Sequence, residues 1–349
     1  MGTSSGSICL VPIINSIAGP GSFQKKLKVA FERRGIRVHH DPNEADTAAI
    51  LIIAGTRHLP PLWDARRRGV RIVQRLNGIN WVHRHRNLGL RYALRAELAN
   101  LLLVYTRWFL ADHVVYQSAF TRDWWHNWYG GHKAAYSVIH NGVDLQAYSP
   151  AGDEKPPTDH IRVQIVEGQL NPDNRLSLDN SIAFSRALEK ASGKPVELVV
   201  IANIHPELRD EISKDSQGTR VTFVGVIPRQ QVPMHSRAAH IQFSADINAS
   251  CPNSVVEALA CGLPVAAFDS GALPELVQGD AGVVVPYGAN PWKLERPDFD
   301  TLAQAALPIL SEQKRFRTAA RALAEERFGL ERMAESYLKA LLGSTANNY

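Results

Sequence analysis

Short apolar, β-branched runs alternate with amphipathic helical stretches along most of this 349-residue chain. Strands of that composition suit a parallel sheet that helices cover on both faces. The alternation runs through two passages, and a polar segment with three prolines, between Asn141 and His160, separates them. The predicted strands are 8–15, 36–40, 48–54, 71–76, 113–118 and 136–140 in the first passage, and 161–168, 196–202, 221–225 and 241–246 in the second.

The length suits two domains of roughly 150 residues each. We therefore predict an α/β protein made of two doubly wound, Rossmann-like domains that face a central cleft. The predicted first domain is 1–150 and the second is 151–327. The last forty residues are rich in Ala, Leu, Glu and Arg, and we expect a helix at about 328–345 to pack back on the first domain.

Charge is distributed unevenly between the two passages. Residues 1–160 hold 20 Lys and Arg against 12 Asp and Glu, a balance of +8, whereas residues 161–349 hold 19 against 22, a balance of −3. Between Arg57 and Arg95 there are ten arginines and one acid, Asp64. Such an asymmetry is expected where one half meets an anionic partner, although a solvated face has the same composition.

The same basic region contains leucines at helical spacing, with Arg91, Arg95 and Arg107 nearby. This pattern predicts an amphipathic helix, whose apolar stripe either packs on the sheet or contacts a membrane surface. The stripe consists of Leu94, Leu98, Leu101 and Leu102.

The cysteines and the termini bear on the compartment. Cys9, Cys251 and Cys261 lack metal-ligand spacing, which favours small buried residues in a reduced, cytoplasmic protein. No apolar run approaches the roughly 18 residues of a membrane span, and the start of the chain lacks a signal-peptide pattern. We expect a cytoplasmic protein, with peripheral contact at the inner face of a membrane as an option. His83 and His85 have no acids close by, so no metal is expected there.

The segment "ASCPNSVVEALACGLP" predicts a loop and then a short helix that ends near Gly262. Ser254 is a favourable N-cap, and the amides at that helix start are suited to a diphosphate. Glu257 has two interpretations. It completes an S-x-x-E capping box with Ser254, or it binds a ligand.

Several segments, in order, resemble the retaining glycosyltransferases of family four, the group 1 glycosyl transferases. They are "AGPGSF", "HNGVDLQAYSP", "VTFVGVIPRQQV", "NSVVEALACGLPVAAFDSGALPELVQGDAGVVV" and "EERFGLERMAESYLKALL". The resemblance implies the GT-B fold, and it implies that Glu257 binds the ribose hydroxyls of a nucleotide-sugar. The other residues that it assigns to donor binding are Gly19, Gly21, Gly168, Gln169, Asn174, Asn253, Ser254 and Val255.

The chain departs from the family pattern at charged positions. Ala249 replaces the first glutamate of Glu-x7-Glu, which contacts the transferred sugar in the family. Gln169 and Asn174 replace the Arg-x4-Lys pair that neutralises the leaving diphosphate, and Asn77 aligns with a histidine near the donor sugar.

Losing two cationic contacts to phosphate costs about 3–6 kcal/mol, so another cation is needed for catalysis. Arg175 is the first candidate, and with Asn77 it forms the predicted catalytic pair. Arg75 and Arg57 are further candidates, and each is also interpretable as a surface arginine.

The resemblance implies transfer of a hexose from a UDP- or GDP-sugar to an acceptor hydroxyl with retention of configuration, in the synthesis of a cell-envelope polysaccharide or glycolipid. No metal or other cofactor is expected, because stabilisation of the departing phosphate carries the catalysis. The basic first domain favours an anionic or lipid-linked acceptor, and no nucleic acid is expected. The alternative is a catalytically degenerate nucleotide-sugar-binding protein or partner subunit; an epimerase fits the junction and tail segments less well.

Overall fold

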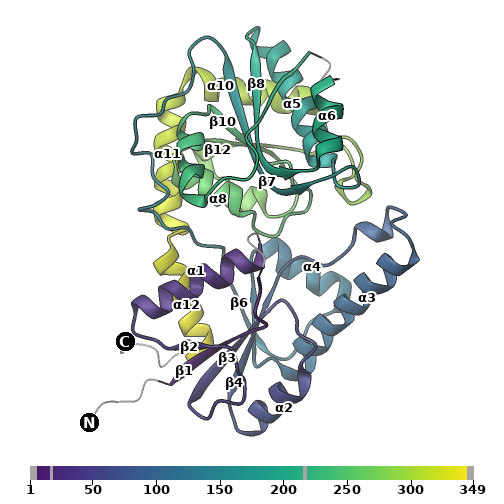
Figure 1. Ribbon diagram of the computed structural model, residues 1–349, viewed down its shortest axis with the longest axis vertical. Coiled ribbons are helices and arrows are strands. Elements are labelled where there is room, and N and C mark those ends of the chain that lie inside the picture. The colour runs from purple at the N-terminus through teal and green to yellow at the C-terminus, as the bar shows by residue number, and fades with distance from the viewer. Residues whose placement is uncertain (1–5, 16–18, 215–217, 344–349) are drawn as a thin grey trace. The chain divides into compact units, whose positions relative to one another are not determined.

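The computed structural model of the protein describes residues 6–15, 19–214 and 218–343. The chain divides into two compact units, one of Met1–Gly142 with Leu330–Tyr349, and one of Val143–Gly329. Each unit contains a six-stranded sheet in which all neighbouring strands are parallel. The predicted α/β class and the doubly wound arrangement are therefore confirmed (Figure 1).

The first unit has the strand order β2-β1-β3-β4-β5-β6. Strands β1, β3 and β4 are almost wholly buried, because their Ile, Leu and Val side chains face helices on both sides of the sheet. The strands are β1 (Ser7–Val11), β2 (Val38–His39), β3 (Thr47–Ile53), β4 (Arg71–Leu76), β5 (His113–Tyr116) and β6 (Ala135–Val138). The helices are α1 (Pro20–Arg33), α2 (Leu59–Arg67), α3 (Leu90–Tyr105), α4 (Ala119–Tyr129) and α12 (Leu330–Leu342).

Helix α12 comes from the end of the chain and packs in the first unit, beside α1 (Figure 1). Its apolar side chains join the core formed by β1, β3 and α1, and the ring of Tyr337 lies 5.1 Å from that of Phe23, centroid to centroid. The sequence predicts this helix at about 328–345. Residues 344 and 345 lie outside the described residues.

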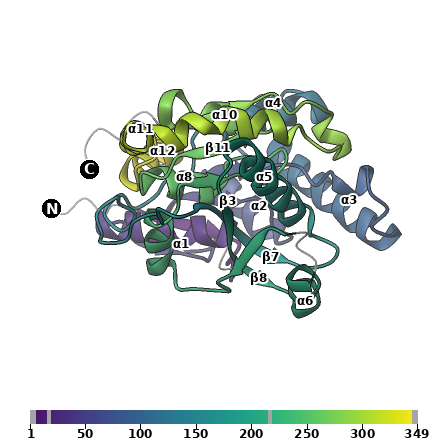
Figure 2. The same ribbon diagram turned by 90° about the horizontal axis from the view of Figure 1, so that it is seen from above.

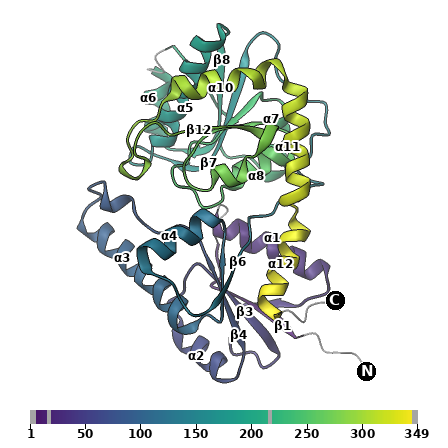
Figure 3. The ribbon, with the colours of Figure 1, turned by 180° about the vertical axis from the view of Figure 1, so that it is seen from behind.

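The second unit has the strand order β12-β11-β10-β7-β8-β9. Helices α5 and α10 lie side by side on one face of this sheet (Figure 2), and α8 packs against α11 (Figure 3). The strands are β7 (Ile161–Leu170), β8 (Val196–Ile204), β9 (Arg220–Phe223), β10 (Ile241–Phe243), β11 (Val265–Phe268) and β12 (Gly282–Val285). The helices are α5 (Leu176–Ser192), α6 (Pro206–Lys214), α7 (Val232–Arg237), α8 (Asn253–Ala260), α9 (Leu273–Leu276), α10 (Phe299–Ser311) and α11 (Gln313–Arg327).

The segment after Gly142 belongs to the second unit, whereas the sequence-based boundaries are residues 150 and 327. The Val143 amide donates to the Phe328 carbonyl at 2.8 Å. The Arg321 guanidinium donates to the carbonyls of Tyr148, at 2.8 Å, and Leu145, at 3.1 Å. These bonds join residues far apart in sequence, so composition does not reveal them.

Two predictions about side-chain burial have different outcomes. The cysteines are free and buried as predicted, and burial raises the pKa of both Cys9 and Cys261 to about 12. Of the two alternatives for the leucine stripe, packing on the sheet is wrong for Leu94, Leu98 and Leu101, which are exposed, whereas Leu102 is half-buried. No helix among the described residues combines the length and the apolar composition that crossing a membrane requires.

Candidate functional site

Each sheet has one point at which its strand order reverses. In the first unit this point lies between β1 and β3, and in the second between β7 and β10. Ligands of open α/β sheets bind beyond the carboxyl ends of the strands at such a point. The predicted residues Gly19 and Gly21 begin the helix that follows β1, and Gly168 and Gln169 lie near the carboxyl end of β7.

The turn before α1 has the backbone geometry that the sequence suggests. Gly19 has a φ of 53°, which favours glycine, and Pro20 takes the first helical position. Gly21 is buried within the first turn. The start of α1 is thus fixed by glycine and proline, with its first amides directed beyond the turn.

Polar residues follow three neighbouring strands of the first sheet and surround Arg75, near the end of β4. The Arg75 guanidinium donates to the Oδ1 of Asn77 at 2.8 Å, the Oε1 of Gln117 at 2.7 Å and the Oδ1 of Asn141 at 2.9 Å. It also lies over the ring of Phe23 in α1, 3.8 Å from the ring centre. Arg75 therefore connects the carboxyl ends of β4, β5 and β6 to the helix that carries the glycine turn.

The surface interpretation of Arg75 is wrong, because only 1% of the residue is exposed. Arg57, by contrast, is exposed. Asn77 accepts from Gln117 as well, at 2.7 Å, and its carbonyl accepts from the Trp125 indole at 2.7 Å. Asn77 is thus held in one orientation by Arg75, Gln117 and Trp125. The sequence analysis missed Gln117, which lies near the end of the predicted strand 113–118, and Asn141, which directly follows the predicted strand 136–140.

In the second unit, helix α8 starts without a side-chain cap. Its N-cap residue is Pro252, and Ser254 is already inside the first turn. The predicted N-cap and the capping box of Ser254 with Glu257 are therefore wrong, since the helix begins two residues earlier than that box requires. The Val256 amide makes the first i to i−4 bond, to Pro252. The amides of Asn253, Ser254 and Val255 precede it and have no intrahelical acceptor at that spacing.

Glu257 is buried on α8, and its negative charge acts on Tyr148, whose hydroxyl group donates to the Arg229 carbonyl at 3.4 Å. Burial and then the negative charge of Glu257 raise the pKa of Tyr148 well above its ordinary value, against the opposing charge of Arg229. The buried carboxylate therefore lies one turn from the uncapped helix start. Tyr148 and Arg229 lie in the quoted segments "HNGVDLQAYSP" and "VTFVGVIPRQQV", yet nothing in those letters indicates that they meet at Glu257.

The region after β7 brings Gln169 and Asn174 together. The side-chain amide of Asn174 donates to the Gln169 carbonyl at 3.1 Å, and both residues are exposed. Arg175 binds elsewhere. Its guanidinium pairs with the carboxylates of Asp179 at 3.0 Å and Glu211 at 2.8 Å, and the hydrogen bond that it donates to Asp179 is the main cause of its raised pKa. Two acids thus compensate the charge of the predicted catalytic cation.

Two acids that the sequence analysis missed lie at the reversal point of the second sheet. Glu167 is near the end of β7, and Asp246 follows the neighbouring strand β10. Loss of solvation, and then the negative charge of Asp246, raise the pKa of Glu167 well above its ordinary value. Because it holds two acids, the carboxyl edge of β7 and β10 is a less favourable place for phosphate than the start of α8.

Ala249, which replaces the acid of the family pattern, lies in a tightly held loop. Its carbonyl accepts from the Ala272 amide at 2.8 Å, and the Asn248 amide donates to the Ser270 hydroxyl at 2.8 Å. A Cβ on Gly271 would lie 2.5 Å from the Ala249 backbone, so glycine is needed there. Within the described parts of the chain, no three or more His, Cys, Asp or Glu residues are arranged to hold a metal.

Two solved structures match the fold of almost the whole chain. Sucrose-phosphate synthase from Thermosynechococcus elongatus matches with a TM-score of 0.70 at 17% identity, over 95% of this chain and 97% of that one. Anabaena HepE, in complex with UDP and glucose, matches with a TM-score of 0.65 at 17% identity, over 96% of this chain and 99% of that one. The protein has the GT-B fold.

Two family models match most of the sequence. "Glycosyltransferase Family 4" matches residues 26–147, and "Glycosyl transferases group 1" matches residues 168–312. The chain belongs to the group 1 glycosyltransferases of family four. Alpha-maltose-1-phosphate synthase of Mycolicibacterium smegmatis is 26% identical over 220 residues, 58% of this chain and 55% of that protein. The match to this synthase spans about half of the length of that protein.

Proposed function

We propose that this protein transfers a hexose from a UDP- or GDP-sugar to an acceptor hydroxyl with retention of configuration. The observation that carries the proposal is the combination of an uncapped helix start and a buried carboxylate, both on α8. In this proposal the amides of Asn253, Ser254 and Val255 bind the diphosphate, and Glu257 accepts hydrogen bonds from the ribose hydroxyls. Membership of the family and the UDP complex of HepE support it.

The first unit contributes the Gly19 to Gly21 turn and the Arg75 cluster. Asn77, oriented by Arg75, supplies a neutral amide to the donor sugar, and Ala249 leaves donor choice less restricted than an acid would. Gly168, Gln169 and Asn174 line the path of the departing diphosphate, and Arg175 must exchange its carboxylate partners to neutralise it. No metal or other cofactor takes part in this scheme.

The acceptor in this proposal is anionic or lipid-linked, because the basic residues concentrate in the first unit. The proposed setting is the cytoplasm, with peripheral contact at the inner face of a membrane, in the synthesis of a cell-envelope polysaccharide or glycolipid. Nucleic acid is not a proposed partner.

One observation favours a second candidate, a nucleotide-sugar-binding protein or partner subunit without catalysis. Gln169 and Asn174 are neutral, and Arg175 is in ion pairs with Asp179 and Glu211. A donor site of this kind binds the nucleotide but leaves the departing diphosphate without a dedicated cation.

Calorimetry with UDP- and GDP-hexoses tests the donor site, and mass spectrometry with candidate acceptors tests transfer. Glu257→Gln keeps the shape but removes the charge, so donor affinity should fall about 10–100-fold. Glu207→Gln, an exposed acid on α6 of the same unit, is the matched control and should leave affinity unchanged. Equal affinities for both variants contradict the donor site. Binding with no transfer selects the second candidate, and the anomeric configuration of the product, read by NMR, tests retention.

A further inference from the structure

Helix α3 of the first unit carries an exposed apolar stripe that faces away from its own domain and that includes Leu90 in place of the half-buried Leu102. Leu90, Leu94, Leu98 and Leu101 follow one another at spacings of four, four and three residues, which places them on one side of the helix. Leu90 is 75% exposed and Leu98 is 66% exposed. Trp108 and Phe109, in the π-helical turn that ends α3, are also exposed. Exposed apolar side chains in such a row mark a surface for binding.

The stripe is not the side by which α3 is held. Its opposite side is buried at Ala96 and Asn100. The Asn100 side chain accepts from the Asn80 amide at 3.0 Å and donates to the Asn80 carbonyl at 2.9 Å. Glu97 pairs with Arg84 at 2.7 Å. Because these contacts anchor α3, the exposed leucines are available to a partner without unfolding the helix.

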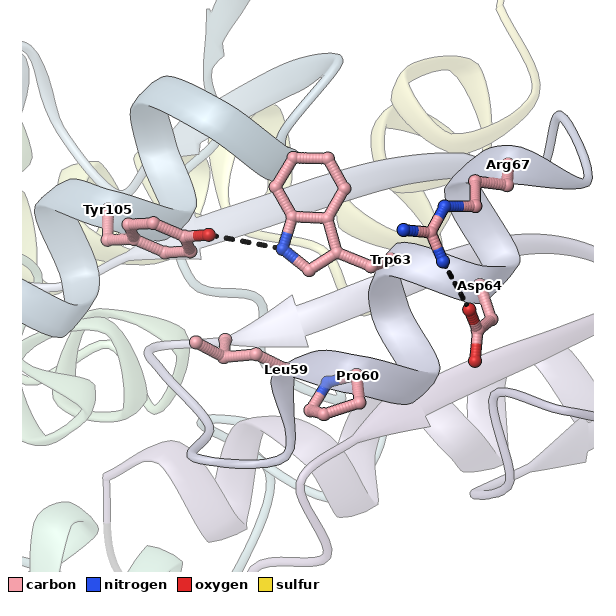
Figure 4. Close-up of a pocket in the computed structure, with 6 residues that line it drawn as sticks. All are labelled: Leu59, Pro60, Trp63, Asp64, Arg67 and Tyr105. Carbon is pink, nitrogen blue, oxygen red and sulfur yellow. Dashed lines mark hydrogen bonds and ion pairs between the residues drawn. The ribbon is translucent and has the colours of Figure 1, made fainter.

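An open cavity adjoins the stripe at the end of α3. It has a volume of about 530 Å³ and is lined by side chains of α2 together with Tyr105. The Trp63 indole donates to the Tyr105 hydroxyl at 3.1 Å, and Arg67 lies at the rim (Figure 4). Trp and Tyr side chains of this kind favour the interface between water and an apolar phase.

Basic side chains flank the stripe. Arg91 and Arg95 each follow a stripe leucine by one residue, which rotates them about 100° around the helix from it. Both are exposed, and neither forms an ion pair among the described residues. The excess of arginines over acids between Arg57 and Arg95 continues the positive charge over α2. A second copy of the chain would bring the same arginines against one another, and this repulsion disfavours self-association.

We propose that the α3 surface, defined as Leu90, Leu94, Leu98, Leu101, Trp108 and Phe109 with Arg91 and Arg95, docks on an anionic phospholipid bilayer. The leucines enter the boundary between headgroups and acyl chains, and the arginines meet the lipid phosphates. The helix lies in the plane of the interface. This docking rests on the membrane contact of the proposed function, but it requires neither binding of the sugar donor nor transfer of the sugar.

Flotation of the full-length protein with vesicles of phosphatidylcholine, alone or mixed with phosphatidylglycerol, tests the docking. We expect binding to the mixed vesicles that weakens as salt rises, and little binding to phosphatidylcholine alone. Leu94→Glu with Leu98→Glu should reduce binding about 100-fold, and Arg91→Glu with Arg95→Glu at least about tenfold. Val29→Glu, at an exposed apolar position on α1, is the matched control and should bind as the parent does.

Leu98→Cys labelled with an environment-sensitive dye gives a second measurement, because the native cysteines are buried. Its emission should shift to the blue on mixed vesicles, whereas a label at Val29→Cys should not respond. Equal binding to both vesicle types, or full binding by the leucine variant, overturns the proposal. The proposal is also overturned if the protein does not bind vesicles but forms a dimer that the leucine substitutions dissociate. That result would assign the α3 surface to contact with a second copy of the chain. Donor calorimetry is done without vesicles, so failure of docking and failure of the donor site are separate results.

Discussion

Replacement of Arg75 by methionine should destabilise the first unit, because one guanidinium connects the ends of three strands. Arg75→Met removes the hydrogen bonds to Asn77, Gln117 and Asn141, and of these three oxygens the Asn77 Oδ1 still accepts from Gln117. Hydrogen bonds to a charged group contribute about 1.5–3 kcal/mol each, and the lost desolvation cost of the guanidinium offsets part of this sum. Contact with Phe23 is retained, because methionine also packs on an aromatic ring. We expect a net loss of about 2–4 kcal/mol.

The assay is thermal and urea unfolding, and a loss of that size lowers the Tm of a unit this large by about 4–16 °C. Arg71→Met on the same strand is the control, because Arg71 is half-buried and donates to one carbonyl, that of Ala340, at 3.0 Å. It should cost about 1 kcal/mol. Donor affinity should fall in Arg75→Met and not in the control, since Asn77 loses its orientation. Equal destabilisation by the two substitutions refutes the reasoning.

Two further predictions concern the second unit. Asp179→Asn removes one of the carboxylates that hold Arg175, so donor affinity measured by calorimetry should rise about 2–5-fold; an unchanged affinity rules Arg175 out as the phosphate cation. Glu197 has a pKa of about 2, because hydrogen bonds from Thr222, Arg162 and His160 outweigh the burial that alone would raise it. Its stabilising contribution is present above the ordinary pKa of 4.5 and is lost as pH falls toward 2. Urea unfolding should therefore separate Glu197→Gln from the parent protein at neutral pH, with the gap closing below pH 4.5; a constant gap contradicts this assignment.

Local patterns in the sequence were sufficient to predict the architecture. The strands are runs of Ile, Leu and Val that only a sheet covered on both faces can bury, and the helices between them show their own periodicity. The short helix that carries Glu257 was also predictable, because Gly262 and Pro264 end it and the loop before it ends at Pro252. The start of that helix was wrong by two residues, since proline and serine are both acceptable at the boundary.

The positions of the charged side chains depended on contacts between distant residues. Arg75 and Arg57 look alike in the sequence, yet Arg75 is buried among amides that follow β5 and β6, whereas Arg57 is exposed. Arg175 is one residue beyond Asn174, which aligns with the lysine of the family. Its guanidinium, however, donates to Glu211, 36 residues later in the sequence.

The sequence by itself determined the two doubly wound units, the glycine turn before α1 and the helix that carries Glu257, because these depend on the order of neighbouring residues. Only the tertiary structure decided that Arg75 is buried, that Arg175 is paired and that the leucines of α3 face outward. The physical reason is that the periodicity of apolar residues predicts which residues share a face of a helix, whereas the packing of other elements decides whether that face is covered. Whether the charge of an arginine is compensated is likewise decided by the partners that folding brings to it.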